Sequence, residues 1–145
     1  MMKKFTLGTL ALGILVTSAC QNTSQQNEEA EKLATEAIEI HDEIMPQITA
    51  FNKHEILIDS LLQNLSVLKT VDANLDTAKT KDKFHTLKEN LESATDKMMV
   101  WMKEYVADST DINYQKAEVD RISDLKTEFE QVTYEAESLL APFKK

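Results

Sequence analysis

The chain has 145 residues, enough for one ordinary domain, and 25 acidic against 16 basic side chains give it a formal net charge of −9. This excess of acid disfavours nucleic acid and anionic lipid head groups as partners, because both require the opposite charge. The only glycines are Gly8 and Gly13. The rest of the chain therefore lacks the glycine-rich loops of phosphate and dinucleotide sites and the glycines favoured in tight hairpin turns.

The N-terminal segment has the features of an export signal. Two lysines precede an apolar segment, 5–16, that is too short for a comfortable membrane span. The following Thr17-Ser18-Ala19-Cys20 resembles a lipobox, with threonine at the position where leucine is usual. We therefore predict a lipoprotein signal peptide over residues 1–19 and a lipid on Cys20. The alternative is an ordinary signal peptide cut after Ala19, which leaves a free thiol.

Cys20 is the only cysteine, and this favours lipidation, since a secreted protein gains little from one unpaired reactive thiol. We expect an exported protein that is lipid-anchored to the cell envelope, at the outer membrane and facing the periplasm. Several acyl chains would be needed, because a single chain anchors weakly. The polar residues after the cysteine, 20–27, should form a flexible tether.

Beyond residue 27, apolar side chains recur every three or four positions, which predicts amphipathic helices. The first stripe runs from Leu33 to Leu65 and keeps its phase through Pro46, which falls on the opposite, solvent-facing side. A proline in that place can bend a helix around its core without ending it. We predict one kinked helix that ends near Lys69; the alternative is a break into two helices at the proline.

Two further stripes, 84–105 and 114–143, predict a second and a third helix. Asp76 or Thr77 is a favourable N-cap for the second helix, and the loop 108–111, which ends at Asp111, supplies the cap of the third. The predicted fold is an all-α domain over residues 28–145. It is an antiparallel up-down-up three-helix bundle with long helices, or a four-helix version if the proline breaks the first helix.

Sulfur-containing and aromatic side chains should gather at one end of this bundle. With a tight turn at 70–76, antiparallel helices of equal rise place Met45 opposite Trp101, Ile48 opposite Met98 and His41 opposite Tyr105. The start of the third helix brings a further tyrosine to that end. The candidate metal ligands are His41, Met45, Met98 and Met102, and the residues predicted to line the site are Met99, Trp101, Tyr105 and Tyr114.

The simplest interpretation of this cluster is structural, because methionine fills irregular gaps in a core and packs well against aromatic rings. A functional alternative is a site for Cu(I) or Ag(I), since thioether sulfur is a soft ligand that needs no deprotonation. His41 would add an imidazole, and Trp101 would shield the cation with its π face. A second alternative is non-covalent haem, held by His41 and a methionine.

No catalytic set is evident. His41-Asp42-Glu43 are consecutive helical residues that point about 100° apart, so they cannot converge on one substrate. No nucleophile stands at a recognisable spacing from a base. We therefore predict no enzymatic activity and no resident cofactor. The expected role is a non-catalytic interaction or structural module of the envelope, whose partner is a protein that meets its acidic faces or a helix that completes the bundle.

Three segments together resemble a known group of proteins. These are the relaxed lipobox, His41-Asp42-Glu43-Ile44-Met45-Pro46 in the first helix and Met98-Met99-Val100-Trp101-Met102 in the second. They look like those of small helical Bacteroidota lipoproteins that often carry the automatic name "viral A-type inclusion protein". The resemblance covers most of the chain after the signal segment. It implies a bacterial envelope location and a helical fold, and it implies no particular activity.

Overall fold

The computed structural model describes residues 18–144, and this range contains helices and loops but no strand, which confirms the all-α class. None of the helices in the described range is long and apolar enough to cross a membrane. The elements in chain order are α1 (Ser18–Ile44), α2 (Gln47–Gln63), α3 (Leu65–Val71), α4 (Thr77–Glu104), α5 (Ile112–Leu140) and the short 3₁₀ helix η1 (Ala141–Phe143).

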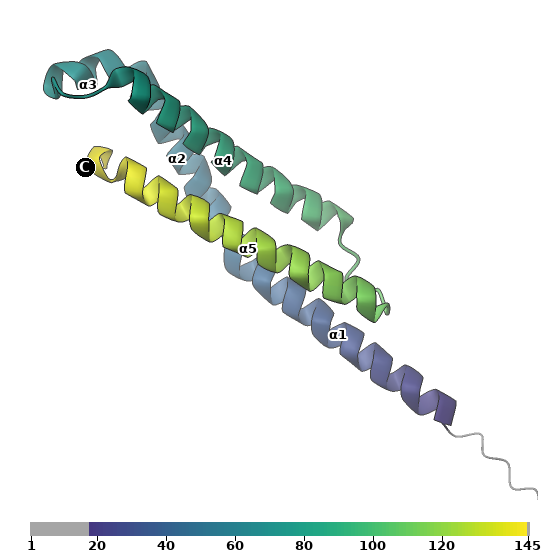
Figure 1. The fold of residues 1–145 in the computed structure, drawn as a ribbon. Coiled ribbons are helices and arrows are strands. Elements are labelled where there is room, and N and C mark those ends of the chain that lie inside the picture. The colour runs from purple at the N-terminus through teal and green to yellow at the C-terminus, as the bar shows by residue number, and fades with distance from the viewer. Residues whose placement is uncertain (1–17, 145) are drawn as a thin grey trace, which may run out of the picture.

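Side-chain contacts fix the directions of the long helices. As the residue numbers increase along α4, the numbers of the contacted residues on α5 decrease, so these two helices are antiparallel (Figure 1). Along α1 and α2, the residue numbers increase together with those of the contacted residues on α5. Both helices therefore run parallel to α5. The α4–α5 contacts are Asn90–Glu135, Lys97–Glu128 and Glu104–Arg121, and the contacts to α5 from α1 and α2 are Glu29–Lys116, Glu43–Lys126 and Gln47–Thr133.

The first helix starts earlier than the sequence predicts. α1 begins at Ser18, whereas the pattern placed its start near Asn27, so the residues expected to form a tether make the first turns of α1. The polar run contains neither proline nor glycine, and extending an existing helix is far easier than nucleating a new one. Cys20 lies in the first turn of α1. Residues 1–17 of the predicted signal peptide lie outside the described residues.

The bend predicted at Pro46 separates α1 from α2. Proline has no backbone N–H to donate to the preceding turn. The amides two and three residues later make shorter-range bonds, Ile48 N to the Met45 carbonyl (3.2 Å) and Thr49 N to the Pro46 carbonyl (3.3 Å). Pro46 itself is exposed, as its position opposite the apolar stripe predicted. Helical hydrogen bonding is thus interrupted, which matches the two-helix alternative, while the chain continues onward at a changed angle (Figure 1).

A second interruption, which the sequence analysis did not anticipate, separates α2 from α3 at Asn64. The Asn64 backbone leaves the helical region at φ −108° and ψ 14°. Its side-chain amide donates to the Ser60 carbonyl at 2.7 Å, so the side chain competes with the backbone for a helical acceptor. The helical chain then resumes and ends at Val71, close to the predicted end.

The predicted apolar stripes form the core. Phe51 on α2 and Phe129 on α5 are fully buried and stack with ring centroids 4.9 Å apart. Phe84 on α4 packs edge-on against Phe143, near the C-terminus, with ring centroids 5.5 Å apart. Both predicted caps are present, since the carboxylates of Asp76 and Asp111 accept backbone N–H groups at the starts of α4 and α5. The core therefore runs along α2, α4 and α5 and includes Ala37 and Ile44 of α1.

Substitution of the central ring tests this packing. Phe129→Ala should lower the free energy of unfolding by about 3–5 kcal/mol, because the buried stack with Phe51 leaves a cavity that the neighbours fill only in part. Tyr134→Ala on the same helix, where the side chain is 73% exposed, should change it by less than about 0.5 kcal/mol. Urea unfolding monitored by circular dichroism measures both, and equal losses would contradict this core.

Candidate functional site

Four aromatic rings form a stacked ladder at the end of the bundle that holds the α4–α5 loop. His41 on α1 stacks on Trp101 of α4 with ring centroids 5.7 Å apart. Trp101 stacks on Tyr105, the C-cap of α4, at 4.5 Å, and Tyr105 stacks on Tyr114 of α5 at 6.5 Å. The structure thus brings together the imidazole, the indole and the two phenols that the sequence placed at one end.

The register of this ladder differs from the sequence prediction by one helical turn. His41 faces Trp101, so its predicted pairing with Tyr105 is wrong. The Tyr105 hydroxyl instead lies 3.3 Å from the Ala34 carbonyl oxygen, two turns before His41. Beyond the bend, Asp59 pairs with Lys88, within one residue of the predicted register. The shift therefore arises across the Pro46 bend, because the prediction assumed equal rise along an uninterrupted helix.

The methionines occupy three environments around the ladder. Met98, one turn before Trp101 on α4, is fully buried in the core. Met45, one turn after His41, is half-buried against the same core. Met99 and Met102 are each 44% exposed. Met45 lies four residues after His41, and Met98 lies three residues before Trp101. Because α1 and α4 run in opposite directions, both methionines lie on the same side of the His41–Trp101 contact and belong to one layer.

A buried glutamine supports the ladder from α5. Gln115 is fully buried, and its Nε2 donates to the carbonyls of Val106 and Ser109 at 3.2 and 3.0 Å. Its Oε1 accepts a hydrogen bond from the Tyr105 hydroxyl at 3.0 Å. Burial, with smaller contributions from Tyr114 and a nearby carboxylate, raises the pKa of Tyr105, which keeps this donor protonated. The glutamine therefore fastens the α4–α5 loop to α5.

The sequence analysis missed Gln115 and assigned its place in the stripe to Tyr114. The signal that could have identified it is its spacing, since Gln115, Glu118 and Ile122 recur at three and four residues and all are buried. Tyr114 instead reaches the loop, where its hydroxyl accepts the Val106 N–H at 2.8 Å. An uncharged polar residue on a core position thus indicated a buried hydrogen-bond network.

Removing the glutamine amide should loosen the loop. Gln115→Met, similar in volume, should lower the free energy of unfolding by about 1–3 kcal/mol, because partly buried carbonyls and the Tyr105 hydroxyl lose their partner. Amide hydrogen exchange in 105–111 should accelerate. The exposed Gln131→Met on the same helix is the matched control and should leave both measurements unchanged. A neutral effect of Gln115→Met would show that water replaces these bonds.

Three buried polar atoms beside the ladder have no hydrogen-bond partner among the described residues. They are His41 Nε2, Trp101 Nε1 and Glu118 Oε2. The other imidazole nitrogen, His41 Nδ1, lies 2.9 Å from Asp42 Oδ1. Because an ionised carboxylate only accepts, this contact assigns the proton to Nδ1 and leaves the Nε2 lone pair free. Buried polar atoms without partners are rare in folded proteins. The layer of side chains around His41 and Trp101 is therefore a candidate binding site.

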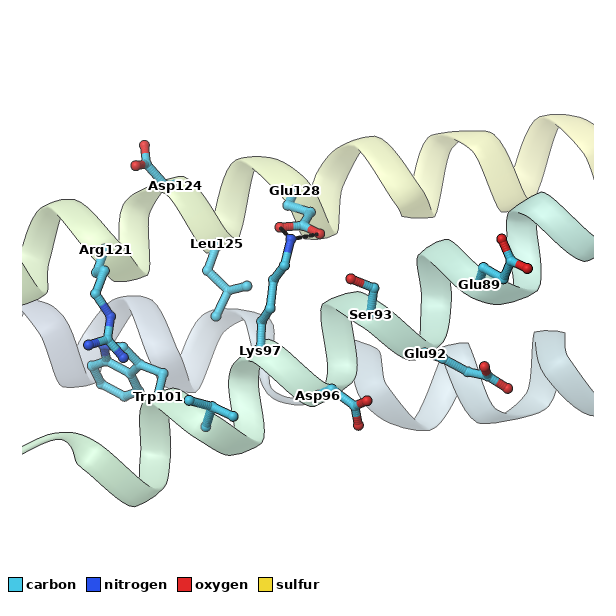
Figure 2. Close-up of a pocket in the computed structure, with 11 residues that line it drawn as sticks. Glu89, Glu92, Ser93, Asp96, Lys97, Trp101, Arg121, Asp124, Leu125 and Glu128 are labelled. Carbon is cyan, nitrogen blue, oxygen red and sulfur yellow. Dashed lines mark hydrogen bonds and ion pairs between the residues drawn. The ribbon is translucent and has the colours of Figure 1, made fainter.

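A second candidate surface is an open groove of about 650 Å³ between α4 and α5 (Figure 2). Its apolar lining comes from Val100, Trp101 and Leu125. Lys97 reaches across to Glu128 at 2.7 Å, which bridges the groove near its middle (Figure 2). Arg121 lines the same end as Trp101 and is paired with two glutamates, one at 3.2 Å and one at 3.3 Å.

The groove has a strongly acidic character. Both of its basic side chains are already paired, whereas four of its carboxylates form no hydrogen bond or ion pair with another described residue. Those carboxylates belong to Glu89, Glu92, Asp96 and Asp124. They lie along both helices, and in Figure 2 Asp96 and Asp124 point to opposite sides of the groove. The groove therefore combines an apolar lining with three unpaired carboxylates on α4 and one on α5.

Within residues 18–144, no three His, Cys, Asp or Glu side chains come together in an arrangement that could hold a metal ion. Methionine sulfur is outside that set of ligands. Comparison of the chain with protein families, with curated protein sequences and with solved structures finds no match.

Proposed function

We propose that this protein is a lipid-anchored, non-catalytic binding module of the bacterial cell envelope. Its partner is a basic amphipathic helix of another envelope protein, which lies in the groove between α4 and α5. The observation that carries the proposal is the composition of that groove: an apolar lining with three unpaired carboxylates on α4 and one, Asp124, on α5.

A helical partner suits this shape and charge. A groove between two antiparallel helices is the place where a further helix completes a bundle, and amphipathic helices commonly bind by laying an apolar face into such a groove. The apolar face would cover Val100, which is 49% exposed, and the small accessible parts of Trp101 and Leu125. Lysine or arginine side chains flanking that face would pair with Asp96 and Asp124, which gives charge complementarity and a faster association.

The anchor and the groove occupy compatible positions. α1 begins at the end of the molecule that carries the α4–α5 loop, and α4 and α5 extend from there along the bundle (Figure 1). About 15 Å of helix separates Cys20 from Ala30, which is buried after the exposed residues 24–29. A lipid on Cys20 would therefore hold the bundle close to a membrane, with the far end of the groove directed away from it.

Charge reversal along the groove tests the binding proposal. The probe is a tryptophan-free synthetic helix of leucine and lysine, about five turns long. Binding is followed by the fluorescence of Trp101, the only tryptophan, in the full chain in detergent. The double variant Asp96→Lys/Asp124→Lys should raise the Kd at least about tenfold, because an unpaired carboxylate on each helix becomes a cation.

The matched control reverses two exposed carboxylates elsewhere. Glu36→Lys/Glu39→Lys on α1 changes the net charge equally but lies outside the groove. At 0.15 M salt this distant change should alter the Kd by less than about threefold, because screening suppresses long-range attraction. Equal weakening by both double variants would show that the peptide senses net charge alone and would overturn the proposed groove.

Lipidation of Cys20 is tested by expressing the full chain in a lipoprotein-processing bacterium. The wild type should enter the membrane fraction with an intact mass raised by acyl chains. Cys20→Ser should lose that mass and leave the membrane fraction after processing, because the thiol that carries the lipid is absent. Thr23→Ala, outside the lipobox, should behave as wild type. A wild-type chain that begins at Cys20 with an unmodified mass would establish the ordinary signal peptide instead.

A further inference from the structure

Where α1 meets α4, the imidazole of His41 has one ring nitrogen that is free to bind a metal ion. His41 Nδ1 is held by Asp42 Oδ1 at 2.9 Å, while Nε2 is buried and has no partner among the described residues. Histidines that bind metals usually donate the remote N–H to a carboxylate or carbonyl, which fixes the tautomer and raises ligand basicity. His41 has this arrangement, and its stacking on Trp101 at 5.7 Å fixes the ring plane.

Methionines lie within one helical turn of His41 and Trp101 along the chain. Met45 follows His41 by four residues, just after the end of α1, and its backbone N–H bonds to the His41 carbonyl at 2.8 Å. Met98 precedes Trp101 by one turn on α4, and the observed register places it opposite Met45. Met102 follows Trp101 and is 44% exposed, so it lies at the outer edge of the layer. By this register, Met45 and Met98 lie at the level of the bundle next to the His41–Trp101 contact.

The electrostatics of this layer favour a monovalent cation. Asp42, which lies against the imidazole, adds a negative charge beside it. The donor atoms are neutral and soft, a set that suits Cu(I) and Ag(I) and does not suit magnesium or calcium, which prefer oxygen.

We propose that the α1–α4 contact is a binding site for one Cu(I) or Ag(I) ion, with His41 Nε2, Met45 and Met98 as ligands and Met102 closing the exposed side. This site is separate from the partner groove, which lies between α4 and α5. Its ligands need no deprotonation and cannot be oxidised to disulfides, so the site suits an oxidising compartment.

Titration with Ag(I) tests the site directly. The full chain carries Cys20→Ser, which removes the competing thiol, and is held in chloride-free detergent buffer with ¹³C-labelled methionine methyl groups. One equivalent of silver nitrate should shift the methyl resonances of Met45, Met98 and Met102 and quench Trp101. Met99, equally exposed on the same helix, is the internal control and should not shift. This measurement needs no change to any proposed ligand.

Affinity then distinguishes ligands from neighbours. In anaerobic competition with a chromogenic Cu(I) chelator, Met45→Leu and Met98→Leu should each weaken binding at least about tenfold, whereas Met99→Leu should leave it unchanged. Leucine is near methionine in volume, so the fold should survive, and circular dichroism checks this. No quenching at one equivalent, silver shifts that include Met99, or equal effects of Met98→Leu and Met99→Leu would each overturn the site.

Discussion

The missing amide of Pro46 is the constraint on which the arrangement of this bundle depends. Without that N–H, α1 and α2 cannot continue as one regular helix, and the chain changes direction between them. α2 therefore packs mainly against α4, while α1 packs mainly against α5. The change also moves the register of α1 against α4 by one turn, which brings His41 onto Trp101. A straight first helix would present a different residue to the indole.

Trp101 connects the two surfaces to which we assign functions. His41 and Tyr105 both stack on its indole, and the side chain, which is 4% exposed, also lines the groove between α4 and α5. A helix lying in the groove would therefore lie beside the same residue that an ion between α1 and α4 would lie beside.

The loop that joins α4 to α5 is rigidified by side chains and not by regular structure. Gln115 and Tyr114 bind its backbone, and Asp111 caps the helix that follows. Tyr105 belongs both to this network and to the ring ladder, so the loop, the ladder and the start of α5 form one connected unit. A buried polar network of this kind specifies a single packing, because each carbonyl that loses its donor is costly.

The sequence by itself determined the helical class, the apolar stripes with Phe84 and Phe129 in the core, the caps at Asp76 and Asp111, and the gathering of histidine, tryptophan and tyrosine at one end. Those features follow from local periodicity and hydrogen-bonding chemistry, which each segment carries within itself. Only the tertiary structure decided the one-turn shift at His41, the burial of Gln115 and the exposure of Met102. These depend on the angle that the chain takes at Pro46 and on which helix α1 meets beyond it, and neither quantity is encoded in the spacing of residues along a single helix.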